Sequence, residues 1–152
     1  MTSFILLSGT LGYCVVSGLV PFVNAELYLL AASAAAPPEL AIPLVLAATL
    51  GQMTAKAAMY GAGRGVVRLP GKRAKGWFEE AEAWAQTRPN TGGTLVLVSA
   101  ASGFPPFYLT SIACGIIRYR FLPFFALGFL GRFIRFGAVV LFPQIGKVLL
   151  NQ

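Results

Sequence analysis

The sequence predicts an all-α membrane protein that is polytopic, crossing the bilayer more than once. Hydrophobic residues make up 57% and charged residues 11% of its 152 residues, whereas soluble domains hold about 45–50% and about 25%. The mean hydropathy is +0.72, and a soluble domain so poor in charge could not cover its surface. Two apolar runs, residues 40–63 and 121–142, are each long enough for one span, which needs about 20 residues.

The composition excludes several classes of site. The chain contains no histidine and no aspartate, so it has no Ser-His-Asp triad, histidine zinc site or aspartate phosphoenzyme. Cys14 and Cys114 each lie in an apolar run, and we expect packing roles for both. We therefore predict no metal and no cofactor. The net charge of +7 is better explained by membrane orientation and anionic lipid than by nucleic acid.

The first element is predicted to be a re-entrant helical hairpin. Residues 1–25 carry no charge, and Pro21, Asn24 and Glu26 then interrupt the apolar sequence. The second arm, residues 27–37, is too short to cross a bilayer. Such a break suggests a hairpin that enters and leaves on one side, with protein or water around its tip. A cleaved signal peptide is the alternative, but no lysine or arginine precedes the apolar stretch.

A full-length span and a basic segment follow. The span, residues 40–63, has Gln52 and Lys56 near its middle. The basic cluster after it consists of Arg64, Arg68, Lys72, Arg73 and Lys75. In the segment that follows, helical spacing relates Trp77, Ala81, Trp84 and Arg88, with glutamates off that face. This pattern predicts an amphipathic helix lying in the membrane interface and ending at Pro89.

The second half repeats the order of the first. Residues 91–117 form two short apolar arms around a break that contains Pro105 and Pro106. The second full-length run, residues 121–142, contains Arg132 and Arg135. This half is therefore predicted to be another re-entrant hairpin followed by another transmembrane helix.

The two halves also share short sequence patterns. SGLVPF at residues 17–22 resembles SGFPPF at residues 102–107, and Leu-Gly precedes a basic residue in both spans. Weak internal symmetry of this kind is typical of transporter repeats. We predict a single membrane domain over residues 1–152, with three parts: repeat 1 (1–64), the basic loop and interfacial helix (65–90) and repeat 2 (91–152).

The distribution of basic residues predicts that the repeats are inverted. If each hairpin returns to its own side, eight of the twelve basic residues share one side, namely the cluster from Arg64 to Lys75 with Arg88, Arg118 and Arg120. The positive-inside rule makes that side cytoplasmic. The first hairpin then enters from outside and the second from inside, with Ser33 and the C-terminus outside.

Glu26 is the candidate proton-coupling residue, because it is the one acid inside an apolar segment. A charge at the bilayer centre costs about 2.5–3.5 kcal/mol and needs a cavity or a partner. The alternative is structural. Asn24 would cap the second arm, and Glu26 would sit on its positive first turn. The two roles are compatible.

Lys56, Arg132 and Arg135 are the candidate anion-binding residues. They place three basic groups in the spans against one acid, so an arriving anion would balance the charge. Arginine suits phosphate because its planar fork forms two parallel hydrogen bonds, and the hairpin tips add helix N-termini. The alternative is that Arg132 and Arg135 extend to an interface or bind annular lipid.

These residues also carry a family resemblance, over roughly residues 15–140. The chain resembles the DedA family, the bacterial branch of the VTT-domain (SNARE-associated Golgi protein-like) proteins. The matching segments are PFVNAE at residues 21–26, Gly51 with YGAGR at residues 60–64, FPP at 104–106 with ACG at 113–115, and GRFIRF at 131–136. The chain is short for the family, and Lys56 stands near the place where the family often has a second acid.

The resemblance implies a lipid flippase or scramblase, or a proton-coupled transporter, in the bacterial inner membrane. Polyprenyl phosphates and phospholipids are the implied substrates, and the membrane acid and arginines the implied functional residues. We thus expect a transporter, not an enzyme, with membrane lipids and protons as partners. A lipid-phosphate enzyme would usually need a histidine or an acid cluster. A non-catalytic assembly or lipid-binding subunit remains an alternative, and homo-oligomerisation stays open.

Overall fold

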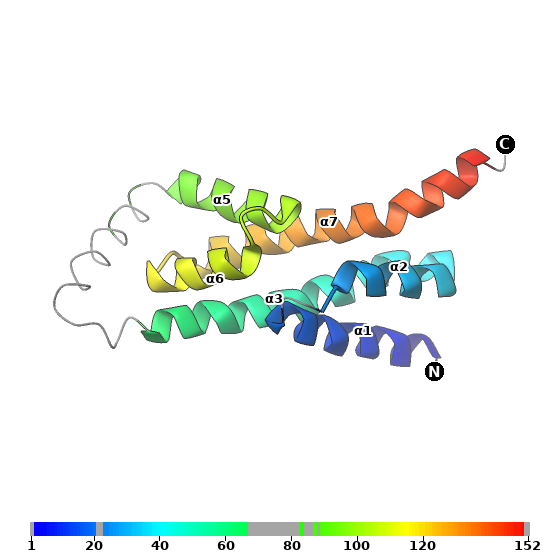
Figure 1. Cartoon of the computed structure of the whole chain (residues 1–152), viewed down its shortest axis with the longest axis horizontal. Helices are drawn as coiled ribbons and strands as arrows, with labels where there is room; N and C mark the ends of the chain where they lie inside the picture. Colours follow the sequence, from blue (N-terminus) through cyan, green and yellow to red (C-terminus); the bar gives the residue numbers. More distant parts are fainter. Residues whose placement is uncertain (1, 21–22, 67–82, 84–86, 88, 151–152) are drawn as a thin grey trace.

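The computed structural model describes residues 2–20, 23–66, 83, 87 and 89–150. These parts are helical and contain no strand, which confirms the all-α class (Figure 1). The α-helices are α1 (Thr2–Leu19), α2 (Ala25–Ala35), α3 (Ala41–Val66), α5 (Pro89–Ser102), α6 (Phe107–Ile116) and α7 (Phe121–Leu150), and a 3-10 helix, η1 (Pro38–Leu40), precedes α3.

The long helices α3 and α7 run antiparallel along the long axis of the molecule (Figure 1). Two segments are long and apolar enough to cross a membrane: Pro38–Gly65, made of η1 and nearly all of α3, with a mean hydropathy of 1.3, and Phe121–Leu141 of α7, with 1.8. Large apolar side chains such as Ile42 and Leu122 are exposed on these helices. Outer faces of this kind suit contact with lipid. The two predicted runs thus form long apolar helices that are candidate spans, and α7 continues to Leu150, beyond the predicted run.

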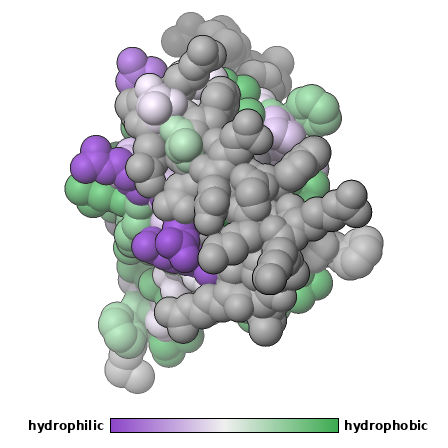
Figure 2. Space-filling view, turned by 90° about the vertical axis from the view of Figure 1, so that its left-hand side faces the viewer, coloured by the Kyte–Doolittle hydropathy of each residue, from purple (hydrophilic) through white to green (hydrophobic). Residues whose placement is uncertain are grey.

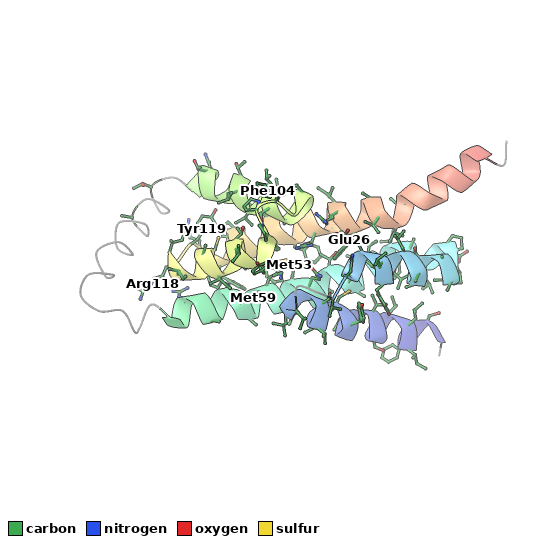
Figure 3. The ribbon with its side chains drawn as sticks, in the orientation of Figure 1. Glu26, Met53, Met59, Phe104, Arg118 and Tyr119 are labelled. Carbon is green, nitrogen blue, oxygen red and sulfur yellow. The ribbon has the colours of Figure 1, made fainter. Side chains whose placement is uncertain are left out.

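The four shorter helices form two hairpins that point toward each other. Helices α1 and α2 turn near the middle of the long axis, and their outer ends lie at the end that carries both termini (Figure 1). Helices α5 and α6 also turn near the middle, but their outer ends lie at the opposite end. Glu26 and Phe104, next to the two turns, therefore both lie near the centre of the molecule (Figure 3).

Each long helix packs closely against the first arm of its own half. A Cβ atom on Gly51 of α3 would overlap the backbone oxygen of Leu11 in α1. A Cβ on Gly131 of α7 would come within 2.7 Å of the Cβ of Ala100 in α5. The second arms cross over, so that α2 contacts α7 and α6 contacts α3. Because each second arm contacts the long helix of the other half, the two halves form one packed unit.

Contacts between the arms stabilise each hairpin. In the first hairpin, the rings of Tyr13 and Tyr28 stack with centroids 4.2 Å apart, and the hydroxyls of Thr10 and Tyr28 are 3.1 Å apart. In the second, Ser99 donates to the carbonyl of Pro105 at 2.6 Å and lies 2.9 Å from the hydroxyl of Thr110. Both turns are therefore held by polar contacts inside an apolar surrounding.

Polar side chains lie at the end of the molecule opposite the termini (Figure 2). Seen end-on, hydrophilic side chains gather on one side of this end while hydrophobic side chains project from the flanks (Figure 2). Arg118 and Tyr119 lie in this region (Figure 3). The hydroxyl of Tyr60, near the end of α3, donates to the backbone oxygen of Tyr119 at 2.5 Å. This bond fixes the α6–α7 connection against α3.

Two predictions fall outside the described residues in whole or in part. Pro21, predicted at the first hairpin tip, is not among them. Of the predicted interfacial helix, only Ala83 and Thr87 are described; both are helical, and Thr87 donates to the Ala83 carbonyl at 2.9 Å. That helix therefore stays a prediction.

Candidate functional site

A polar cavity of about 340 Å³ lies where the two hairpin turns meet the long helices. Helices α1, α2, α3, α6 and α7 all contribute to its wall. The four charged residues singled out from the sequence all line it: Glu26, Lys56, Arg132 and Arg135. So do two of the predicted tip residues, Asn24 and Pro106. Pro105 is not in the wall, but its carbonyl accepts from Ser99, which fixes the turn before Pro106.

Arg135 connects the two hairpin turns. Its Nε donates to Oε1 of Glu26 in α2 at 2.5 Å, and its Nη1 lies 3.4 Å from the backbone oxygen of Ala101 in α5. Gly103, with φ of +82°, lies so close that a Cβ would come within 2.5 Å of Nη1. A side chain at this position would therefore displace Arg135. The ion pair is about one-third exposed, at 26% for Arg135 and 33% for Glu26.

Glu26 has the helix-end position considered for it and also lines the cavity. The side chain of Asn24 caps α2, accepting from the backbone N–H of Glu26 at 2.9 Å and of Leu27 at 3.3 Å. Glu26 thus sits in the first turn of α2, where the helix dipole favours a negative charge. Its carboxylate also faces the cavity and pairs with Arg135. The Asn24 cap therefore fixes the start of α2 so that the Glu26 carboxylate lies at the cavity.

Lys56 has a protein partner that the sequence did not reveal. Its Nζ donates to the backbone oxygen of Gly18 at 2.6 Å, and Sδ of Met59 is 3.8 Å away. Gly18 belongs to the last turn of α1, whose carbonyls have no partner within the helix. A positive charge there is favourable for the helix dipole. Lys56 therefore anchors the end of α1 at the cavity.

Arg132 differs from the other two basic residues in its contacts. Its guanidinium carbon lies 5.1 Å from the ring centroid of Phe107 and 5.9 Å from that of Phe136. Its Nε is buried and has no hydrogen-bond partner in the described part of the chain. The two rings hold the guanidinium by cation–π contacts, which leave its donors for another acceptor.

The sequence did not single out Ser17, Gln52 or Gly103 as site residues, although all three line the cavity. Gln52 is only 5% exposed, and its Nε2 donates to Oγ of Ser17 at 3.0 Å. The sequence did offer one signal for Gln52, because a polar amide near the middle of a predicted span is unusual. The role of Gly103, which leaves room for the Arg135 side chain, could not be predicted from the sequence because it depends on where Arg135 lies.

The electrostatics of the cavity favour an anion. Its wall carries three basic side chains against one acid. The N-termini of α2 and α6 both begin at the wall, at Ala25 and Phe107, and helix N-termini carry partial positive charge. The described wall therefore provides charge and hydrogen-bond donors suited to a phosphate-like group.

Helices of membrane-spanning length, paired with short hairpins that turn around a polar cavity, define a helical membrane protein with a polar cavity among its helices. The chain matches the VTT domain family model over residues 20–144, which covers everything after α1 except the last turns of α7. It belongs to the VTT-domain family, the DedA and SNARE-associated Golgi protein-like proteins, which confirms the resemblance found in the sequence. No curated protein matches the chain, and no solved structure does.

Proposed function

We propose that this DedA-type membrane protein moves an anionic lipid, such as a phospholipid or a polyprenyl phosphate, across the bilayer. The observation that carries the proposal is Arg132, which lines a positively charged cavity and whose buried Nε has no protein partner in the described residues. A phosphate oxygen would satisfy this donor and balance the excess positive charge.

The proposed topology puts the cavity near the middle of the bilayer. In it, both hairpins are re-entrant, and the two halves are inverted repeats that exchange their second arms. The support is the opposite direction of the hairpins and the matching contacts of Gly51 and Gly131. The positive-inside rule then assigns the end that carries Arg64, Arg118 and Arg120 to the cytoplasm, in the inner membrane of a bacterium.

A lipid fits this cavity better than a free ion because residues that adjoin its lining residues in the sequence expose apolar side chains. Leu27 follows Glu26 in α2 and is 66% exposed, and Phe104 follows Gly103 and is 79% exposed. Ile134 precedes Arg135 and is 54% exposed. A headgroup in the cavity would leave its acyl chains beside such residues, in the hydrocarbon of the bilayer.

The ion pair suggests how a proton would be coupled to the movement. Arg135 already holds the Glu26 carboxylate, so a phosphate that binds Arg135 has to compete with it. A proton on Glu26 would weaken this pair and free the guanidinium for the lipid. Release of the proton on the other side would restore the pair and expel the headgroup.

The test is a lipid exchange assay in liposomes that contain the purified protein. Acyl-labelled lipids with anionic or zwitterionic headgroups are added, and the fraction reachable by an impermeant quencher is followed. We expect anionic lipids to exchange faster than phosphatidylcholine and to be recovered chemically unchanged. Exchange no faster than in protein-free liposomes would contradict the proposal, and release of phosphate would instead favour a lipid-phosphate enzyme.

A further inference from the structure

Two buried polar atoms lack a hydrogen-bond partner in the described residues: Oε1 of Gln52 and Nε of Arg132, two residues that line the cavity. They are opposite in kind, since an amide oxygen only accepts and an arginine Nε only donates. Buried polar groups without partners cost stability and are uncommon in native proteins. Because both residues line the same cavity, one ligand there that supplies an acceptor and a donor would satisfy both atoms.

The orientation of the Gln52 amide follows from its neighbours. The hydroxyl of Ser17 donates its one proton to the backbone oxygen of Cys14 at 3.1 Å. Ser17 can then only accept from Gln52, which it does from Nε2 at 3.0 Å. The amide nitrogen therefore faces Ser17, and Oε1 is the atom left to receive a donor.

The charge of the cavity decides which donor fits. Arg132 would take an anionic phosphoryl oxygen, as in the proposed function on which this inference rests. An ammonium group would meet Lys56, Arg132 and Arg135, while the one acid, Glu26, is already paired. An uncharged hydroxyl avoids this repulsion. We propose that the cavity selects an anionic phosphodiester headgroup that bears a hydroxyl, and that Gln52 is the specificity-determining residue that accepts from it.

The first test compares two lipids that differ in hydroxyl groups alone. Acyl-labelled phosphatidylglycerol and phosphatidylpropanol have the same phosphodiester charge and the same number of headgroup carbons. In liposomes with the wild-type protein, phosphatidylglycerol should exchange about tenfold faster, the size expected for one hydrogen bond in a site sheltered from water. Native mass spectrometry of the protein in detergent should show the same preference in bound lipid.

The second test assigns the preference to Gln52. Gln52→Met keeps the length of the side chain but removes the acceptor. The exchange rate of phosphatidylglycerol should therefore fall to that of phosphatidylpropanol. Gln52→Asn, which shortens the side chain by one methylene, should reduce the preference and serves if the methionine variant fails to fold. Thr54→Val is the matched control, because Thr54 lies on the same helix, is exposed and donates only to the Leu50 carbonyl.

The outcomes separate this inference from the proposed function. Equal rates and equal binding for the two lipids in the wild type would overturn the hydroxyl selection while lipid movement stands. A preference that survives in Gln52→Met would overturn the role of Gln52. A Gln52-dependent preference for phosphatidylethanolamine over phosphatidylcholine would show that an ammonium is read instead. Absence of all exchange would contradict the proposed function, and the binding comparison would still decide the inference.

Discussion

Arg132 and Arg135 lie one helical turn apart, yet they have different surroundings. Arg135 pairs with Glu26 and approaches the second hairpin turn, whereas Arg132 is held between two aromatic rings. The sequence predicted the charged residues that line the cavity, because charges inside apolar segments are rare. It could not predict which of them pair, since Glu26 and Arg135 are 109 positions apart.

Substitutions of Glu26 separate its two roles. Glu26→Gln keeps the size of the side chain but cannot carry a proton, so exchange should be lost along with any response to a pH gradient. Glu26→Asp keeps the charge on a shorter arm and should retain part of the activity. The measurement is lipid exchange with and without an imposed gradient. If the glutamine variant is fully active and responds unchanged, Glu26 is only a favourable helix-end charge, worth about 0.3–1 kcal/mol.

Lys56 should behave as an anchor for α1 rather than as the main lipid ligand. Lys56→Met leaves the Gly18 carbonyl without its charged donor and should lower the free energy of unfolding by about 1–3 kcal/mol. Lys56→Arg can still donate and should retain most of the stability. Thermal unfolding in detergent measures both variants. Unchanged stability in Lys56→Met together with lost exchange would make Lys56 a lipid ligand instead.

At the scale of the elements, the breaks in the apolar sequence were the most informative feature. Proline and asparagine at the turns predicted two helical hairpins, and Asn24 does cap α2 as proposed. The exchange of second arms between the halves could not be predicted, because it depends on close helix contacts at glycines. One such contact is at Gly63, where a Cβ would overlap the backbone oxygen of Ile112 in α6.

Two glycines of α3 provide a matched test of this packing. Gly63→Ala should force α3 and α6 apart and lower stability by about 1–3 kcal/mol, the usual cost of overpacking. Gly61→Ala should keep or raise stability, because a Cβ there meets no atom within 4 Å and alanine favours the helix. Equal melting temperatures for the two variants would contradict the packing described between α3 and α6.

At the scale of the whole molecule, composition and run length predicted a helical membrane protein, and the family match agrees with that class. Composition works well here because the lipid environment restricts the choice of residues more strongly than the fold does. The cavity was predicted only in outline, from the hairpin tips and the charged residues expected to hold an anion together. Its shape depends on side chains from five helices, which no local pattern in the sequence encodes.

The orientation of the molecule can be tested with single cysteines. Ala34 is exposed near the end of α2, and Gly65 is exposed near the end of α3 with open space around its Cβ position. In intact cells an impermeant thiol reagent should label Ala34→Cys but not Gly65→Cys. The native Cys14 and Cys114 are buried, so the wild-type protein measures the background labelling. Labelling of Gly65→Cys before permeabilisation would show that the orientation is the reverse of the proposed one. It would also contradict the assignment made from the basic residues.

The central claim is that anionic lipids move through the cavity and bind Arg132 as they do so. The most direct measurement compares Arg132→Ala with Arg120→Ala in the same liposome exchange assay, since each removes one arginine but Arg120 is exposed near the start of α7. We expect Arg132→Ala to slow anionic exchange about tenfold or more, Arg132→Lys to restore part of it, and Arg120→Ala to exchange at the wild-type rate. If the folded Arg132→Ala variant exchanges anionic lipid at the wild-type rate, the claim is contradicted.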